Sequence, residues 1–217
     1  MDAQLRAQLA AIVGPRGVDA RLEAVSPRST AEVAAVCRAC AGLGTPISAV
    51  SGAVTDPAPG GRAISVSLGR LDDVLVDEGA MVVRAGAGAT LDSLRAAVDA
   101  ARMALVGISG GPTATHAGSL VARGGVPRRA LTGIEAVLPD GQVVRAGGRV
   151  LKDVTGYDLA GMLIGSMGRL ALITEVVFRL EPVDARGAAP DPPAAAGAVS
   201  ELLRHAFDPD GLLVAAR

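Results

Sequence analysis

The sequence has few of the residues that carry most enzyme chemistry. Its 217 residues include two His, two Cys, one Tyr, two Phe and no Trp. It also has no Asn and a single Lys, Lys152, which lies near the only Tyr, Tyr157. With so few ligating and nucleophilic side chains, no Ser-His-Asp set, no pair of acid and base residues and no metal-ligand group can be assembled. We therefore predict no metal site and assign no catalytic residue.

Charge and hydropathy exclude two classes of partner. The formal net charge is -1, so the chain lacks the positive surface by which proteins bind nucleic acid or anionic membranes. No apolar run is long enough to cross a bilayer, and the acidic start does not have the pattern of a signal peptide. We expect a cytoplasmic protein without direct membrane insertion, in which any association with a membrane is made through partners.

The two cysteines, Cys37 and Cys40, form a Cys-x-x-Cys pair inside a segment with helical periodicity. A zinc site needs a second pair, and a thioredoxin-like site needs a strand that leads directly into the pair. The sequence has neither, so we interpret both thiols as small side chains that pack a helix.

The periodicity of apolar residues predicts helices mixed with short strands, which is typical of an α+β fold. Helices are predicted over residues 3–13, 30–42, 90–101 and 198–206. Strands are predicted over residues 47–50, 64–68, 74–76, 81–85, 136–138, 143–146 and 170–180. Turn residues at 77–79 and 139–141 predict two hairpins.

Changes in composition divide the chain into four parts. Residues 1–71 are expected to form a first α+β lobe and residues 72–183 a second one. Residues 184–197 are rich in Ala, Pro and Gly and are interpreted as a linker. Residues 198–217 are expected to form a C-terminal helix and tail.

The most informative segment covers residues 150–182, VLKDVTGYDLAGMLIGSMGRLALITEVVFRLEP. Glycines beside its predicted core strand let a ligand approach the backbone closely, because Gly has no side chain in the way. The run Lys-x-Val-x-Gly-Tyr-Asp-Leu, followed by Gly-Ser-x-Gly and a Thr-Glu strand, resembles the flavin domain of FAD-linked oxidases of the vanillyl-alcohol oxidase (PCMH) type. Within that family the segment is most similar to the small FAD-binding subunit of bacterial glycolate oxidase.

The resemblance implies an architecture. The chain is expected to be a two-lobed PCMH-type FAD-binding domain with a C-terminal helix that packs back on the first lobe. In larger family members a substrate or cap domain stands where this chain has residues 184–197. We therefore expect a flavin domain whose cap domain is missing.

The resemblance also implies three segments that contact FAD. The loop after the strand at 47–50 provides Ser51, Gly52, Ala53, Val54 and Thr55. The second segment provides Thr115, Gly118 and Ser119. The third provides Gly165, Ser166, Gly168 and Ile173, on the adenine and ribose side. No His or Cys stands where a covalent flavin link is expected, so we predict noncovalent FAD.

The chain departs from the family pattern in two of its cofactor segments. In residues 50–55, where relatives are richer in Gly, Gly52 stands alone, and Val54, Pro57 and Pro59 follow it, which makes a poor nest of N–H groups for an anion. Relatives also carry extra residues after the pair Arg128 and Arg129. These arginines are interpreted as solvated loop charges or as contacts for an anion or a partner. His116 is interpreted as a loop residue, and a role as a base stays open.

Two functions follow. The first is the FAD-binding subunit of a glycolate oxidase-like 2-hydroxy acid dehydrogenase complex, with electron transfer through FAD. The resemblance implies a larger FAD-linked oxidase subunit and an iron–sulfur subunit as partners. The alternative is a non-catalytic scaffold that has lost FAD and binds the larger subunit. A Rossmann-type nucleotide site is excluded, because residues 86–90 lack the third Gly and the acidic residue of that motif.

Overall fold

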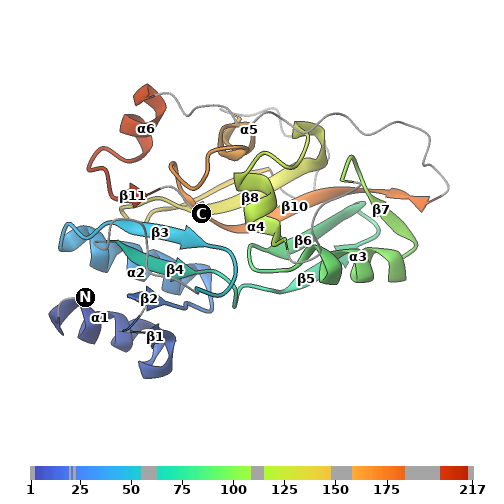
Figure 1. Ribbon diagram of the computed structural model, residues 1–217. Coiled ribbons are helices and arrows are strands. Elements are labelled where there is room, and N and C mark those ends of the chain that lie inside the picture. Colours follow the sequence, from blue (N-terminus) through green and yellow to red (C-terminus); the bar gives the residue numbers. More distant parts are fainter. Residues whose placement is uncertain are drawn as a thin grey trace.

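The computed structural model describes residues 3–19, 21, 23–54, 63–108, 115–147, 158–183 and 201–214, without the side chain of residue 202. These residues form two β-sheets that lie side by side, each packed against helices (Figure 1). The predicted α+β class is confirmed.

The first sheet has the strand order β1-β2-β4-β3-β11. Its strands are β1 (Val18–Asp19), β2 (Ala24–Val25), β3 (Ile47–Val50), β4 (Ile64–Ser67) and β11 (Leu213–Val214). The 3-10 helix η1 (Pro15–Gly17) follows α1 (Ala3–Val13), and α1 and α2 (Thr30–Gly42) bury apolar side chains against the sheet. Ser29 caps α2, because its Oγ accepts a hydrogen bond of 3.2 Å from the N–H of Glu32.

The second sheet is antiparallel, with the order β5-β6-β10-β8-β9 and with β7 paired to one end of β10. Its strands are β5 (Val74–Asp77), β6 (Val82–Gly86), β7 (Met103–Leu105), β8 (Leu131–Val137), β9 (Val143–Gly147) and β10 (Leu172–Pro182). The helices of this lobe are α3 (Leu91–Ala100), α4 (Ala117–Ala122), α5 (Leu159–Leu163) and the 3-10 helix η2 (Arg128–Ala130). Strand β10 pairs with both β6 and β8, and most of its residues on both faces are buried, which explains why its sequence is so apolar.

The two lobes share part of their cores. One group of buried side chains fills the second lobe between its sheet and α3, α4 and α5. A second group fills the first lobe but also includes Ala87, Val137 and Leu172, which belong to the second lobe. Each of these three side chains is fully buried. The lobes are therefore joined by continuous apolar packing rather than by a solvated linker.

The C-terminal segment packs back on the molecule, as expected, but the described side chains of its helix pack against the second lobe rather than against the first lobe that was predicted. In α6 (Glu201–Phe207), the side chains of Leu203 and Phe207 pack against the core of the second lobe. The buried carboxylate of Asp208 then accepts hydrogen bonds of 2.8 Å from the N–H groups of Leu212 and Leu213. These bonds set the direction of the chain as it enters β11. Strand β11 pairs in parallel with β3 of the first sheet. Strand β11, rather than the helix, provides the pairing with the first lobe.

Most predicted elements are confirmed, with ends that shift by a few residues. The largest shift is in β8, which begins at Leu131 rather than at residue 136. Pairing with β10 extends β8 through Thr132 and Gly133, and such pairing is not visible in local propensity. The predicted linker at 184–197, and Lys152 and Tyr157, lie outside the described residues.

A polar network ties the start of α2 to the second sheet. The carboxylate of Glu135 on β8 accepts hydrogen bonds from the hydroxyls of Thr30 and Thr174 and pairs with Arg145 on β9. Burial raises the pKa of Glu135, but the hydrogen bonds from the two threonines and from Arg145 outweigh it and hold that pKa below its usual value. Thr30 belongs to the first lobe, so the network is a second link between the lobes.

We predict that Glu135→Gln lowers the free energy of unfolding at pH 7 by about 1 to 2 kcal/mol, because it weakens a partly buried, charge-assisted network in which the Arg145 side chain is 70% exposed. The folded-state pKa of Glu135 is lowered, so its stabilising contribution is present above the unfolded pKa and is lost as the pH falls through the folded pKa. Urea denaturation should therefore show that the wild type loses more stability than the variant from about pH 5 downward.

The control for this substitution is Glu201→Gln, whose side chain is 82% exposed in a pair with Arg204. An exposed pair of this kind contributes little, so the control should be about as stable as the wild type. A Glu135→Gln protein with wild-type stability at every pH would contradict the proposed role of the network.

Candidate functional site

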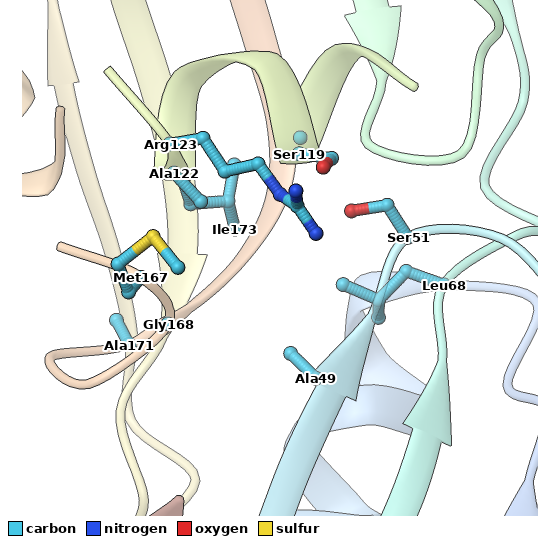
Figure 2. A pocket seen from close by; sticks show the side chains of 11 residues that line it. Ala49, Ser51, Leu68, Ser119, Ala122, Arg123, Met167, Gly168, Ala171 and Ile173 are labelled. Atoms are coloured by element: carbon cyan, nitrogen blue, oxygen red, sulfur yellow. The ribbon is translucent and has the colours of Figure 1, made fainter. Parts of the chain in front are cut away.

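A pocket lies between the two lobes, where β3 and β4 of the first sheet face α4 and the start of β10 (Figure 2). It has about 450 Å³ of space between atoms, including space open to solvent. Its described lining consists of Ala49, Ser51, Leu68, Gly118, Ser119, Ala122, Arg123, Met167, Gly168, Ala171 and Ile173. Segments far apart in the sequence therefore meet in one place.

The polar side chains of this pocket come from opposite walls. Ser51 follows β3, whereas Ser119 and Arg123 belong to α4 and its C-cap. Figure 2 shows the hydroxyl of Ser51 pointing toward the guanidinium of Arg123, which reaches from α4 into the pocket. The rest of the lining is apolar or glycine, with Leu68, Ala171 and Ile173 buried. Such a surface suits an organic ligand that carries an anionic group.

The side chains of Ser67 and His116 contact the loop that carries Ser51. The carbonyl oxygen of Gly52 accepts a hydrogen bond of 2.7 Å from the hydroxyl of Ser67. On its other side, a Cβ added at Gly52 would lie 2.5 Å from Cε1 of His116. Only a glycine fits between the Ser67 hydroxyl and the imidazole ring without displacing a neighbour. His116 thus packs against the loop from the second lobe and holds Ser51 in place.

The Gly-Ser-Met-Gly segment packs against the end of α4. The N–H groups of Gly165 and Met167 donate hydrogen bonds of 3.0 and 2.8 Å to the carbonyls of Val121 and Ala122. Gly165, Met167 and Gly168 all have positive φ, which two glycines adopt without strain. The turn that results places Met167 and Gly168 in the pocket wall. Ser166 points elsewhere: its Oγ is buried and has no hydrogen-bond partner among the described residues.

The structure brings part of the predicted site together. The predicted residues that line the pocket are Ser51, Gly118, Ser119, Gly168 and Ile173. The predicted residues that are absent from the described lining are Gly52, Ala53, Val54, Thr115, Gly165 and Ser166. Thr55 lies outside the described residues. All of these assignments stay predictions, because no ligand is present.

Sequence reasoning missed Arg123 and Met167 as pocket residues. Arg123 lies one helical turn after Ser119 on α4, but no helix was predicted over these residues, so the i to i+4 spacing gave no usable signal. Met167 had no signal either, because its position depends on a turn with φ of +54°.

Other candidate groups have structural roles. Burial raises the pKa of Cys37 and of Cys40 to about 12, and both side chains pack inside the first lobe, as predicted. Arg128 pairs with Asp158, and the hydrogen bond from Arg128 lowers the pKa of that carboxylate. Asp158 also caps α5 by accepting a hydrogen bond from the N–H of Gly161.

The described residues contain neither a metal-ligand group nor a membrane-spanning helix. No group of three or more His, Cys, Asp or Glu side chains among them is placed to hold a metal ion. Within the same residues, no helix has both the length and the apolar character needed to cross a membrane.

Comparisons with known proteins point to one family. Residues 22–147 match the family described as FAD binding domain. An uncharacterized FAD-linked oxidoreductase of Mycobacterium tuberculosis is 38% identical over 174 residues, which are 73% of this chain and 37% of that protein. D-lactate dehydrogenase of Archaeoglobus fulgidus is 31% identical over 79% of this chain and 41% of its own length. Glycolate oxidase subunit GlcD of Bacillus subtilis is 30% identical over 73% of this chain and 36% of its own length.

Solved structures have the same fold. 4-Ethylphenol oxidase from Gulosibacter chungangensis matches with a TM-score of 0.69 and 18% identity, over 83% of this chain and 42% of that one. p-Cresol methylhydroxylase matches with a TM-score of 0.67 and 17% identity, over 82% and 43%. These matches confirm the PCMH-type architecture predicted from the sequence. The chain spans less than half the length of these relatives.

We predict that Gly52→Ala destabilises the protein and that His116→Ala reduces the damage. The added methyl group would contact the imidazole at 2.5 Å, so the loop or the ring must shift, at a cost of about 1 to 3 kcal/mol. Removing the ring removes the obstacle, and the double variant should be more stable than the sum of the single effects predicts. Urea denaturation of the four proteins measures this coupling.

Gly42→Ala is the matched control, because a Cβ at Gly42, at the end of α2, would have no atom within 4 Å. It should not destabilise the protein. Strictly additive effects of Gly52→Ala and His116→Ala would show that the ring does not hold the loop.

Proposed function

The chain belongs to the FAD-binding domain family, and from this membership we propose that it is the FAD-binding subunit of a 2-hydroxy acid dehydrogenase complex of the glycolate oxidase type. The family match and the FAD-linked relatives make FAD its cofactor. Glycolate and D-lactate, which the names of two relatives contain, are both 2-hydroxy acids. Oxidation of such an acid at the carbon that bears the hydroxyl is therefore the proposed reaction.

The observation that carries the proposal is the convergence of the predicted cofactor segments on the interlobe pocket. Ser51 comes from the first segment, Gly118 and Ser119 from the second, and Gly168 and Ile173 from the third. These segments were predicted from the sequence as contacts for FAD, and the fold places them around one space.

The residues of the pocket fit FAD. Its pyrophosphate needs hydrogen-bond donors and positive charge, which the Ser51 and Ser119 hydroxyls and the Arg123 guanidinium provide. Gly118 and Gly168 leave room for a close approach to the backbone, and the buried Leu68 and Ile173 provide an apolar wall.

Noncovalent binding is consistent with the positions of the possible attachment groups. Cys37 and Cys40 are buried in α2. Their thiols are protonated at neutral pH, because burial raises their pKa to about 12, and are unsuited to attack a flavin ring. The His116 ring lies against Gly52, outside the described lining of the pocket.

The chain's own contribution to the reaction is binding and orientation. FAD, when bound, supplies the acceptor for the hydride or electrons of the substrate. Among the described lining residues there is no carboxylate, His or Lys, so none of them is suited to take the proton of the substrate hydroxyl. We propose that this base comes from a larger FAD-linked oxidase subunit and that an iron–sulfur subunit receives the electrons.

The domain division of the sequence fits the same proposal. We propose that residues 1–71 and 72–183 act as the two lobes of one flavin domain and that residues 198–217 close it. The double attachment of α6 and β11, one to each lobe, supports this role.

A scaffold that has lost FAD is the second candidate. One observation favours it: Gly52 is the only glycine of residues 51–55, and the His116 ring occupies the space beside it. Val54 does not readily adopt the positive φ that a nest of N–H groups for a phosphate needs. Such a subunit would keep the fold in order to bind the larger oxidase subunit.

The first prediction from the proposed function is that the purified chain, incubated with excess FAD and desalted, retains absorbance bands near ~370 and ~450 nm. Heat denaturation should release all of the flavin into the supernatant, because no covalent link holds it. Ser51→Ala combined with Ser119→Ala should reduce the retained flavin, since two donors to the pyrophosphate are removed.

A colourless protein after the same incubation would contradict FAD binding and favour the scaffold. In that case, co-purification of the colourless chain with a larger FAD-linked oxidase subunit is the outcome expected. Flavin that stays with the denatured protein would contradict the noncovalent assignment.

A further inference from the structure

We propose that Arg123 is the residue that makes flavin binding in this chain depend on the phosphate groups of the cofactor. The inference rests on the proposed function and assigns a specificity-determining role to one side chain. The second FAD segment that the resemblance implies contains Thr115, Gly118 and Ser119 but not Arg123. The role of Arg123 therefore comes from the structure.

Arg123 brings a positive charge to the interlobe pocket. Arg123 is the only charged residue in the described lining of the interlobe pocket. No carboxylate among the described residues forms an ion pair with it. By contrast, Arg84, Arg128, Arg145 and Arg204 each pair with a carboxylate. Within the described residues, the Arg123 guanidinium thus has no carboxylate partner, and it is suited to bind an anion that enters the pocket.

The position of Arg123 at the end of α4 directs its side chain into the pocket. Arg123 is the C-cap of α4, and its N–H donates a hydrogen bond of 3.0 Å to the carbonyl of Ser119, which lies one turn earlier. The two side chains therefore lie on the same side of the helix. Figure 2 shows the guanidinium extending from α4 toward Ser51 on the opposite wall. One guanidinium and two hydroxyls thus converge on the space between the lobes.

The hydrogen-bond donors of Arg123, Ser51 and Ser119 are suited to a phosphate group. A guanidinium has five N–H donors in a planar fork, no acceptor and a permanent charge. A serine hydroxyl adds a donor that rotates to suit its partner. This set matches the non-bridging oxygens of a phosphate or pyrophosphate, which are charged and only accept hydrogen bonds. It gives no comparable advantage to the uncharged ribityl chain of riboflavin.

The test measures the dissociation constants of FAD and of riboflavin, by quenching of flavin fluorescence, for the wild type and for Arg123→Gln. We expect the variant to bind FAD about ten- to a hundredfold more weakly, because charge-assisted hydrogen bonds to the pyrophosphate are lost. Riboflavin binding should change by less than about twofold. Arg123→Lys should recover part of the FAD affinity, because it keeps the charge but loses the fork.

Salt provides a second measure that does not depend on riboflavin. Raising the ionic strength should weaken FAD binding to the wild type and have a smaller effect on the Arg123→Gln protein, because an exposed ion pair is screened. Arg16→Gln is the matched control. It removes one exposed arginine in η1, away from the pocket lining, and should keep the wild-type affinity and salt dependence.

The possible results separate the inference from the function on which it rests. If the wild type binds FAD and Arg123→Gln binds it equally well or more tightly, Arg123 does not select phosphate, although the chain still binds flavin. Equal losses of FAD and riboflavin affinity would also overturn the inference, since the side chain would then only shape the pocket. A wild type that binds no FAD overturns the proposed function and the inference together.

Discussion

The close packing of α4 against the second sheet is the constraint on which the interlobe pocket depends. A Cβ at Gly118 would lie 2.7 Å from the Cβ of Ala87, so a larger residue would push the helix away. The N–H groups of Ala117 and Gly118 donate hydrogen bonds of 2.8 and 2.9 Å to the carbonyls of Ala89 and Ala87. At its other end α4 receives hydrogen bonds from the loop before β10. With both ends fixed, the positions of Ser119 and Arg123 follow.

The opposite wall of the pocket is fixed by the junction of the lobes. Apolar packing through Val137 and Leu172 joins the two cores, and the network around Glu135 ties the start of α2 to the second sheet. Packing and polar links thus act at the same junction. This junction sets the distance between the wall that carries Ser51 and the wall that carries Ser119 and Arg123.

The sequence predicted the helices and strands more fully than it predicted which residues come together in the interlobe pocket. Local patterns sufficed for α2, because Ser29 and Glu32 mark its start, and for the hairpin of β5 and β6, because turn residues separate two apolar runs. The segments of the pocket were predicted through resemblance, and their convergence needed the tertiary fold. Arg123 and Met167 were missed because their roles depend on how α4 and a positive-φ turn face β3. No local propensity encodes such a relation between distant segments.

The make-up of the pocket also bears on the proposed division of the reaction between subunits. Removal of a hydride from a 2-hydroxy acid also requires the removal of the hydroxyl proton, and that step needs a base. The described lining has a single charged side chain, and it is a guanidinium, which cannot accept a proton. The same guanidinium suits the binding of a phosphate. In the proposed complex, this chain would therefore hold the cofactor and a partner would hold the substrate, so that the complete reaction would require their contact.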